Sequence, residues 1–366
     1  MKQSVEIGPD RTVRRLKLIL LVGIAGFFAW HPVRATAGDA AVRHVWVHYD
    51  YMVGPDGVSE APGERAIEMV VAAYRAQGII LHIDPQHTQL PFHRTIYFKT
   101  GGFQVCTDDL VYFEDLKAKY FHPQSNLNWH YAIFARYYGI DPSFAFDPSL
   151  PQFTCFDSFN IGPNGVSEGI PGVNFVVTLG ALRDLRFFAD QWDFAVGAIF
   201  MHELGHNVGL HHGGGEDLNF KPNYISVMNY NFSSIYSPGI PFATMPGATN
   251  IAGYRLDYSN GLLPTLDEQH LNEGAGLGGP STYTDISRFY ADCGTRLVLI
   301  PTNGSPIDWN QNGVATDPDV PLGIAGSYCN GPPILLLADF DDWAAVRGYL
   351  DNPGPHDLVR RPHTIE

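Results

Sequence analysis

Beyond residue 30 the sequence has no apolar run long enough to cross a bilayer, which takes about 20 consecutive apolar residues. The longest apolar run of the whole sequence, Leu18–Trp30, follows a basic stretch and precedes the small residues Ala35-Thr36-Ala37. This order is typical of a secretory signal peptide. We expect residues 1–37 to be removed and the rest to be secreted, extracellular or periplasmic, without further membrane contact. An uncleaved anchor is the alternative, although thirteen residues are short for a membrane span.

Basic residues are scarce as well. The chain of 366 residues has 23 Lys and Arg against 38 Asp and Glu, a net charge of −15. Residues 1–37 hold six basic and two acidic residues, so the remainder carries a net charge of −19. A surface this acidic repels phosphate backbones, which excludes nucleic acid as an expected partner. It is compatible with calcium binding.

Cysteine occurs only four times, always after residue 37: Cys106, Cys155, Cys293 and Cys329. An even number in an oxidising compartment favours two disulfides. The simplest pairing is Cys106–Cys155 and Cys293–Cys329, and three connectivities are open. No two cysteines have the C-x-x-C spacing of a structural zinc site.

The first half of the chain alternates strand and helix patterns. Arg43–Tyr51 alternates and is rich in aromatic and branched residues, Glu64–Ala76 has apolar residues at helical spacing, and Ile79–Ile83 is a second apolar strand. This order predicts a largely parallel sheet. Further predicted elements are the strands Thr95–Lys99, Trp129–Tyr137 and Phe175–Leu179 and the helix Trp192–Val208.

The second half is different in character. Gly, Pro, Asn and Ser dominate after residue 212, and only Ala344–Leu350 has a helical pattern, so we expect mostly irregular structure. The heptapeptide Gly54–Glu60 is echoed by Gly162–Glu168, and we predict a turn at each.

His202, Glu203, His206, Gly209 and His212 form the pattern HExxHxxGxxH. Residues 202 and 206 of a helix lie about 40° apart, so both imidazoles can bind one tetrahedral metal. Glu203 is placed to act as a general base on a zinc-bound water. Gly209 can adopt the left-handed conformation that ends a helix, which would return His212 as third ligand. Three histidines leave one position open, as in catalytic zinc sites.

Two alternatives concern this stretch. A helix with incidental histidines would match five fixed positions in about one chain in 10⁴. His211 is the nearest rival for the third ligand, and the spacing selects His212.

The stretch resembles the extended signature of the metzincin zinc peptidases. Metzincins carry a methionine turn beneath the metal, and Ser226–Tyr230 looks like it. The resemblance implies that Met228 is a hydrophobic floor under the three imidazoles. In astacin-like and serralysin-like members a tyrosine two residues later stabilises the oxyanion, a role that the resemblance implies for Tyr230. Ordinary core positions are the alternative for both.

The resemblance also implies an α+β fold: a metzincin-like two-lobed catalytic domain, with a twisted mixed sheet and an active-site helix above an irregular lobe. The N-terminal lobe would span residues 38–209 and the C-terminal lobe 210–366. Phe175–Leu179 is the candidate for the antiparallel edge strand that pairs with an extended substrate. The strong motifs cover residues 202–230. More diffusely, three segments resemble bacterial secreted metzincins: Trp129–Ala135, Asn174–Gly180 and Lys221–Tyr230.

The sequence therefore predicts a secreted zinc endopeptidase that acts as a monomer on protein or peptide substrates. One alternative is a catalytically silent metzincin-fold adhesin or calcium-dependent surface module, and retention of Glu203 argues against it. Another is a zinc hydrolase that acts on something other than peptides. We expect no latency propeptide, because the interval between residue 38 and the first strand is short, so the enzyme would be exported active or be kept latent by other means.

A second metal is suggested by oxygen-bearing side chains at alternate positions before Gly313, as at the start of a calcium loop. They belong to Asp308, Asn310 and Asn312, and Asp317 or Asp319 could complete the loop. Asp319 replaces the usual glutamate at the twelfth position. A plain Asn-Gly turn without calcium is the alternative reading.

Overall fold

The computed structural model describes residues 42–99, 109–123, 128–139, 164–185, 191–233, 239–248, 250–291, 296–325, 335–353 and 363–364. By its internal contacts the chain divides into residues 1–41 and 42–366, and all described residues belong to the second unit. The predicted signal peptide lies outside the described residues. So do the four cysteines of the predicted disulfides: Cys106, Cys155, Cys293 and Cys329.

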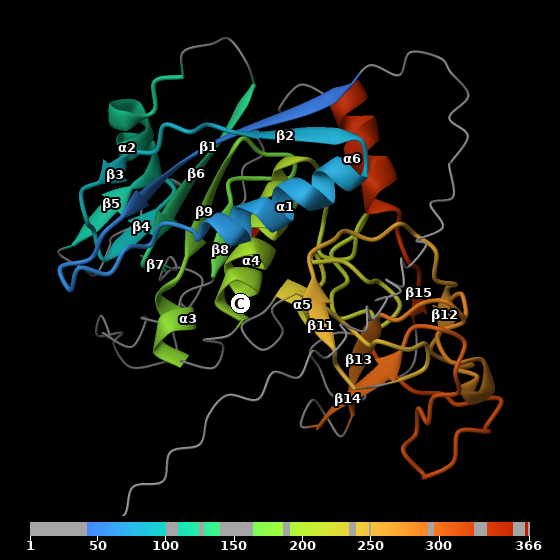
Figure 1. Ribbon diagram of the computed structural model, residues 1–366. Coiled ribbons are helices and arrows are strands. Elements are labelled where there is room, and N and C mark those ends of the chain that lie inside the picture. Colours follow the sequence, from blue (N-terminus) through green and yellow to red (C-terminus); the bar gives the residue numbers. More distant parts are fainter. Residues whose placement is uncertain are drawn as a thin grey trace, which may run out of the picture. The chain divides into compact units, whose positions relative to one another are not determined.

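A seven-stranded mixed sheet organises this unit (Figure 1). Its strands lie in the order β16-β8-β9-β6-β1-β2, and β3 also pairs with β1. They are β1 (Arg43–Met52), β2 (Ile79–Ile83), β3 (Gln89–Leu90), β6 (Trp129–Ala135), β8 (Gly165–Ser167), β9 (Asn174–Thr178) and β16 (His363–Thr364). β1, β2, β3, β6 and β9 run parallel, whereas β8 is antiparallel to β9 and β16 to β8. The predicted α+β class is confirmed.

Alternation along the strands sends apolar side chains to both faces of the sheet. On one face, Val45, Val47 and Phe175 share the main core with α1 (Glu64–Ala76) and α4 (Trp192–Asn207), which pack against each other (Figure 1). On the other face, Ile133 and Val176 join a second core. Burial on both faces explains why β6 and β9 read as nearly continuous apolar runs.

The second core is covered by a small parallel sheet and a helix. The sheet has the order β5-β4-β7, made of β4 (Thr95–Tyr97), β5 (Leu110–Tyr112) and β7 (Tyr137–Tyr138), and α2 (Phe113–Tyr120) follows β5. Ile96 and Phe113, both fully buried, join these elements to Tyr131 of the large sheet. α3 (Gly180–Leu185) follows β9. In the part of the chain that the structure describes, no helix is both long and apolar enough to span a bilayer.

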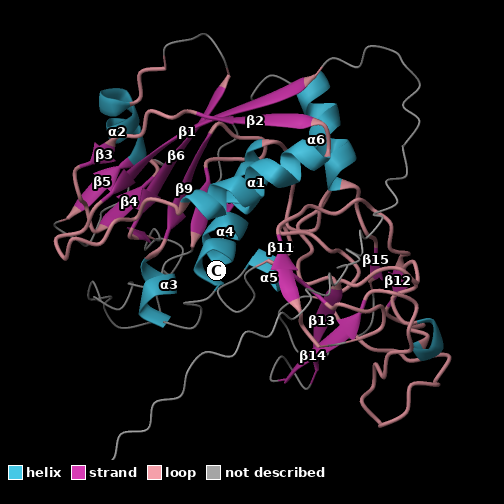
Figure 2. Cartoon of the chain, viewed as in Figure 1, coloured by secondary structure: helices cyan, strands magenta, loops and turns pink. Residues whose placement is uncertain are grey.

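The C-terminal half consists mostly of loops, as predicted (Figure 2). Its short elements are α5 (Tyr230–Ser233), β10 (Ile240–Phe242), β11 (Gly253–Arg255), β12 (Leu266–Asp267), the 3₁₀ helix η3 (Glu273–Ala275), β13 (Ile286–Ala291), β14 (Arg296–Pro301), β15 (Leu336–Leu337) and α6 (Asp342–Asp351). The antiparallel β13–β14 hairpin was not predicted. Trp343 and Val346 of α6 belong to the main core, so that core joins residues on both sides of Gly209. The proposed lobe boundary at this glycine stays a prediction.

Two strand predictions are wrong. Phe175–Leu179 was expected to be an antiparallel edge strand, but β9 lies inside the sheet, parallel to β6. The antiparallel neighbour is β8, within the Gly162–Glu168 segment for which a turn was predicted. Every residue of β9 is buried, because its side chains pack into the cores on both faces of the sheet, while its backbone pairs with β6 on one side and β8 on the other.

Candidate metal centre

Helix α4 carries the first two histidines. It is apolar around its whole circumference, and every residue from Ala195 to Asn207 is buried. Since each residue advances a helix by about 100°, His202 and His206 lie on the same side. Their ring centroids are 4.6 Å apart and their ring planes meet at 85°. Both side chains are completely buried.

The turn after α4 brings in the third histidine. Gly209 has φ of +96°, a conformation that side chains with a Cβ rarely adopt. The backbone N–H of Leu210 donates to Gly205 O over 2.9 Å, which closes the helix end. The chain then returns His212 to within 5.3 Å of His202 and 4.8 Å of His206, measured between ring centroids.

The three imidazoles form a metal-binding geometry. One ligand atom from each of His202, His206 and His212 lies within 4.8 Å of the other two, and the described ranges contain no other such group of three His, Cys, Asp or Glu. The rival histidine lies outside it: His211 pairs through Nδ1 with Asp217 Oδ1 at 2.8 Å. As predicted, the cluster of potential ligands contains His212 and not His211.

Backbone carbonyls orient two of the rings. His202 Nδ1 donates to Val227 O and His206 Nδ1 donates to Leu210 O, each over 2.7 Å. These bonds leave Nε2 of each ring as the ligand atom. His202 Nε2 is buried and has no hydrogen-bond partner, an unmet need that a metal would satisfy. Burial and the neighbouring His212 hold the pKa of His202 well below its ordinary value, which favours the neutral form that binds metals.

Glu203 lies beside the histidines, against strand β8. A Cβ atom added to Gly165 of β8 would come within 2.4 Å of Glu203 Oε1. Both carboxyl oxygens of Glu203 are buried and have no hydrogen-bond partner. Burial raises the pKa of Glu203 well above its ordinary value. A carboxyl group with no partner of its own, next to three potential metal ligands, is suited to exchanging a proton with a substrate or a water.

The predicted methionine turn lies against the same helix. A Cβ on Gly205 would lie 2.4 Å from Met228 Sδ, so this glycine allows the methionine to pack between the turns that carry His202 and His206. Tyr230 is half-buried, and its ring centroid is 4.6 Å from that of His212. The structure thus brings together every residue for which the sequence predicts a role at the zinc site.

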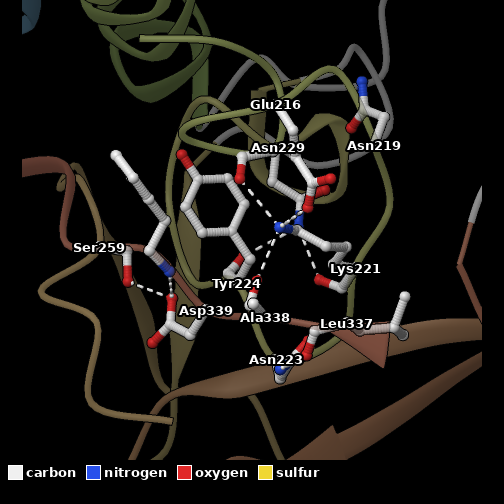
Figure 3. A network of polar contacts seen from close by, with 12 residues as sticks. Glu216, Asn219, Lys221, Asn223, Tyr224, Asn229, Ser259, Leu337, Ala338 and Asp339 are labelled. Atoms are coloured by element: carbon white, nitrogen blue, oxygen red, sulfur yellow. Dashed lines mark hydrogen bonds and ion pairs between the residues drawn. The ribbon is translucent and has the colours of Figure 1, made fainter. Parts of the chain in front are cut away.

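Lys221, to which the sequence analysis assigns no role of its own, fixes the loop between His212 and the methionine turn (Figure 3). Its Nζ donates to Gly213 O over 2.9 Å and to Ala338 O over 2.7 Å, and pairs with Glu216 Oε1 at 3.0 Å. The side chain is only 1% exposed. Asn229 Nδ2 in turn donates to the carbonyl of Lys221 over 2.8 Å. A lysine in a Pro- and Asn-rich loop is ordinarily exposed, so only the structure identifies this role.

A buried carboxyl group holds the methionine turn from the other side. Asp342, the first residue of α6, accepts hydrogen bonds from Tyr224 Oη over 2.8 Å, Ser226 Oγ over 2.6 Å and Ser259 N over 3.0 Å. Its side chain is completely buried, and burial raises the pKa of Asp342 to about 7.

This pKa predicts a pH dependence of stability. The folded protein binds the Asp342 proton more tightly than the unfolded chain does, so protonation stabilises the fold below pH of about 4, and this stabilisation is lost as the pH rises to about 7. The whole change is on the order of 4 kcal/mol. We expect Tm of the wild type to fall relative to Asp342→Asn between pH 4.5 and 7.5. Both proteins keep the metal ligands, so metal effects cancel, and a constant difference in Tm would contradict the expectation.

The predicted calcium loop is ordered largely by its own hydrogen bonds. Asp317 Oδ2 accepts from Asn310 Nδ2 over 2.9 Å and from Asn312 Nδ2 over 2.8 Å, and the carboxylate of Asp308 accepts from two backbone N–H groups. Asp319 lies outside this cluster, because it pairs with His270 Nδ1 at 2.8 Å. Calcium binding by Asp308, Asn310, Asn312 and Asp317 stays a prediction.

Comparison of the chain with models of known protein families and with curated proteins finds no match. Inference about function therefore starts from the geometry of the histidine site and the groups around it.

Proposed function

We propose that the chain is a secreted, zinc-dependent endopeptidase with a metzincin-like fold. The observation that carries this proposal is the convergence of His202, His206 and His212, with ligand atoms within 4.8 Å of one another, beside the carboxyl group of Glu203. Three neutral imidazoles suit zinc and leave a coordination position for water or substrate, as in catalytic rather than structural sites.

Zinc, when bound, would lower the pKa of a coordinated water and polarise the carbonyl group of the substrate. In the reaction that we propose, Glu203 takes the proton of the attacking water and then delivers it to the leaving amine. Its burial and its lack of competing hydrogen bonds support this role. The hydroxyl of Tyr230, whose ring is next to His212, would donate a hydrogen bond to the carbonyl oxygen as negative charge develops there.

Strand β8 is the proposed binding edge for an extended peptide. It lies next to Glu203 through Gly165, and it is antiparallel to β9. A peptide that adds to a sheet edge forms main-chain hydrogen bonds, which favours peptides over other substrates of zinc hydrolases. The outer edge of β8 pairs with β16 over only two residue pairs, His363 with Ser167 and Thr364 with Val166. A bound substrate would replace this short pairing.

The purified protein should contain about one zinc per chain and digest an unfolded protein substrate. Removing the metal with a chelator should abolish digestion, and added zinc should restore it. Absence of digestion by the zinc-loaded protein would contradict the proposed function.

Removal of the third ligand offers a matched comparison within the motif. We expect His212→Ala to weaken zinc binding by more than the 10–100-fold that is typical of residues behind the ligands. His211→Ala should bind zinc as the wild type does, since His211 pairs with Asp217 outside the cluster. Equilibrium zinc titration measures both variants, and equal affinities would show that His212 is not a ligand.

A further inference from the structure

Arg288 is a buried cation whose guanidinium has no carboxylate partner among the described residues. It lies on β13, is 4% exposed, and its Nε makes no hydrogen bond. The chain pairs other arginines differently. Arg255 bonds Asp285 and Asp257, and Arg136 bonds Asp56 and Glu60.

Burial of an unpaired guanidinium costs free energy unless a ligand from outside the folded chain compensates its charge. A buried charge requires a partner, and the ring of Phe232, with its centroid 5.7 Å from the guanidinium carbon, compensates only in part. Burial accordingly lowers the pKa of Arg288 to about 10. An unsatisfied polar group in a native structure calls for an explanation, and a bound anion is one.

Contacts connect Arg288 to the metal centre. Tyr290, two residues along β13 and so on the same face, has its ring 5.9 Å from Phe220. The ring of Phe220 is 5.7 Å from Tyr230, which lies next to His212. Asn231, which follows Tyr230, donates through Nδ2 to Arg288 O over 3.5 Å. Strand β13, which carries the unpaired guanidinium, is therefore linked to Tyr230 through the rings of Tyr290 and Phe220 and through Asn231.

We propose that Arg288 binds a carboxylate of the substrate near the bond that is cleaved. The planar guanidinium can hold both oxygens of a carboxylate, and it would do so out of water, where such a pair is selective. The carboxylate is either the side chain of Asp or Glu or the C-terminal group of a peptide. This inference rests on the proposed function, because it assigns a substrate class to the same site.

The test measures how fast the zinc-loaded enzyme cleaves a set of peptides. The peptides differ only in having Glu or Gln at each position that flanks the cleaved bond, and each is made with a free and with an amidated C-terminus. At one position the wild type should favour Glu, or the free C-terminus, by about 10–100-fold in kcat/KM. Arg288→Met should lose this preference and keep its rate on the Gln amide. Arg288→Lys should keep part of it. The exposed Arg296→Met on the neighbouring strand β14 is the control and should match the wild type.

Thermal stability distinguishes a role of Arg288 in substrate recognition from a merely structural role. Methionine would remove an unpaired buried charge, so Tm of Arg288→Met should rise, whereas a structural arginine would lower it on removal. A lower Tm together with an unchanged Glu-to-Gln ratio would overturn the proposal.

Binding distinguishes failure of this inference from failure of the proposed function. The Glu and Gln peptides are titrated calorimetrically into zinc-loaded Glu203→Gln and into the double variant with Arg288→Met. Tighter binding of the Glu peptide only when Arg288 is present supports the carboxylate site even if no peptide is hydrolysed. Hydrolysis without a carboxylate preference in the wild type refutes the inference and leaves the peptidase proposal standing.

Discussion

Replacing Glu203 by glutamine should lower kcat/KM for an unfolded protein substrate by about 10²–10⁴-fold, the usual contribution of a general base. Glutamine keeps the size of the side chain but cannot take up a proton. The carboxyl group is completely buried and lies against Gly165, so an isosteric change avoids the steric disturbance that a larger residue would cause. Zinc content should stay at one per chain, because the three histidines are unchanged.

Glu68→Gln is the matched control for this experiment. Glu68 is exposed on α1 and makes no contact with the histidines, so this variant should retain full activity. Equal digestion by wild type and Glu203→Gln would eliminate the proposed mechanism. If neither protein digests the substrate, the catalytically silent binding module becomes the better explanation.

The second large effect concerns stability. Lys221→Met should lower the free energy of unfolding by about 3 kcal/mol, because the buried carbonyl oxygen of Gly213 and the part-buried one of Ala338 lose their donor, and a buried loss costs about 1–3 kcal/mol. Gly213 and Ala338 come from parts of the chain far apart in sequence, and Figure 3 shows Ala338 beside Lys221. Methionine retains most of the side-chain volume, so packing contributes little to the expected loss. Denaturant unfolding of the zinc-loaded protein measures the change.

A surface lysine provides the comparison. Lys99 pairs with Asp115 where both side chains are exposed, and exposed pairs add little to stability. Lys99→Met should therefore unfold as the wild type does. If Lys221→Met and Lys99→Met were equally stable, the tether of the loop behind His212 would have no energetic importance.

The cluster of three histidines could be predicted from the sequence because its geometry is mostly local. Two histidines four residues apart meet on any helix, and a glycine that ends the helix allows His212 to return within six residues. The structure shows this convergence. Long-range packing was needed only to place Met228 and Tyr230, and there the resemblance to metzincins supplied the expectation.

The edge of the sheet could not be predicted in the same way. Gly165–Ser167 looks like part of a turn, because its glycine and its likeness to Gly54–Glu60 outweigh three residues of strand pattern. It forms a strand because its backbone pairs with that of β9, and the local sequence does not reveal this partner. The continuous apolar run of β9 was itself a sign of an interior position, since edge strands need fewer buried residues.

Arg288 and Lys221 show a further limit of sequence reasoning. Each is a single cation in a loop-rich region, and such residues are usually solvated. Their burial arises from segments more than fifty residues away, such as Phe232 beside Arg288 and Ala338 beside Lys221. No sequence pattern comparable to HExxHxxGxxH marks Arg288 or Lys221.

The burial of α4 on every side has a consequence for how a metal enters the site. A helix embedded in this way has its rotation and the rotamers of its histidines settled when the chain folds, and the carbonyls of Val227 and Leu210 fix the ring planes. Little conformational entropy then remains to be lost on metal association. Zinc should therefore exchange with a framework that keeps its shape in the apoprotein, unlike small zinc fingers, which unfold when the ion leaves.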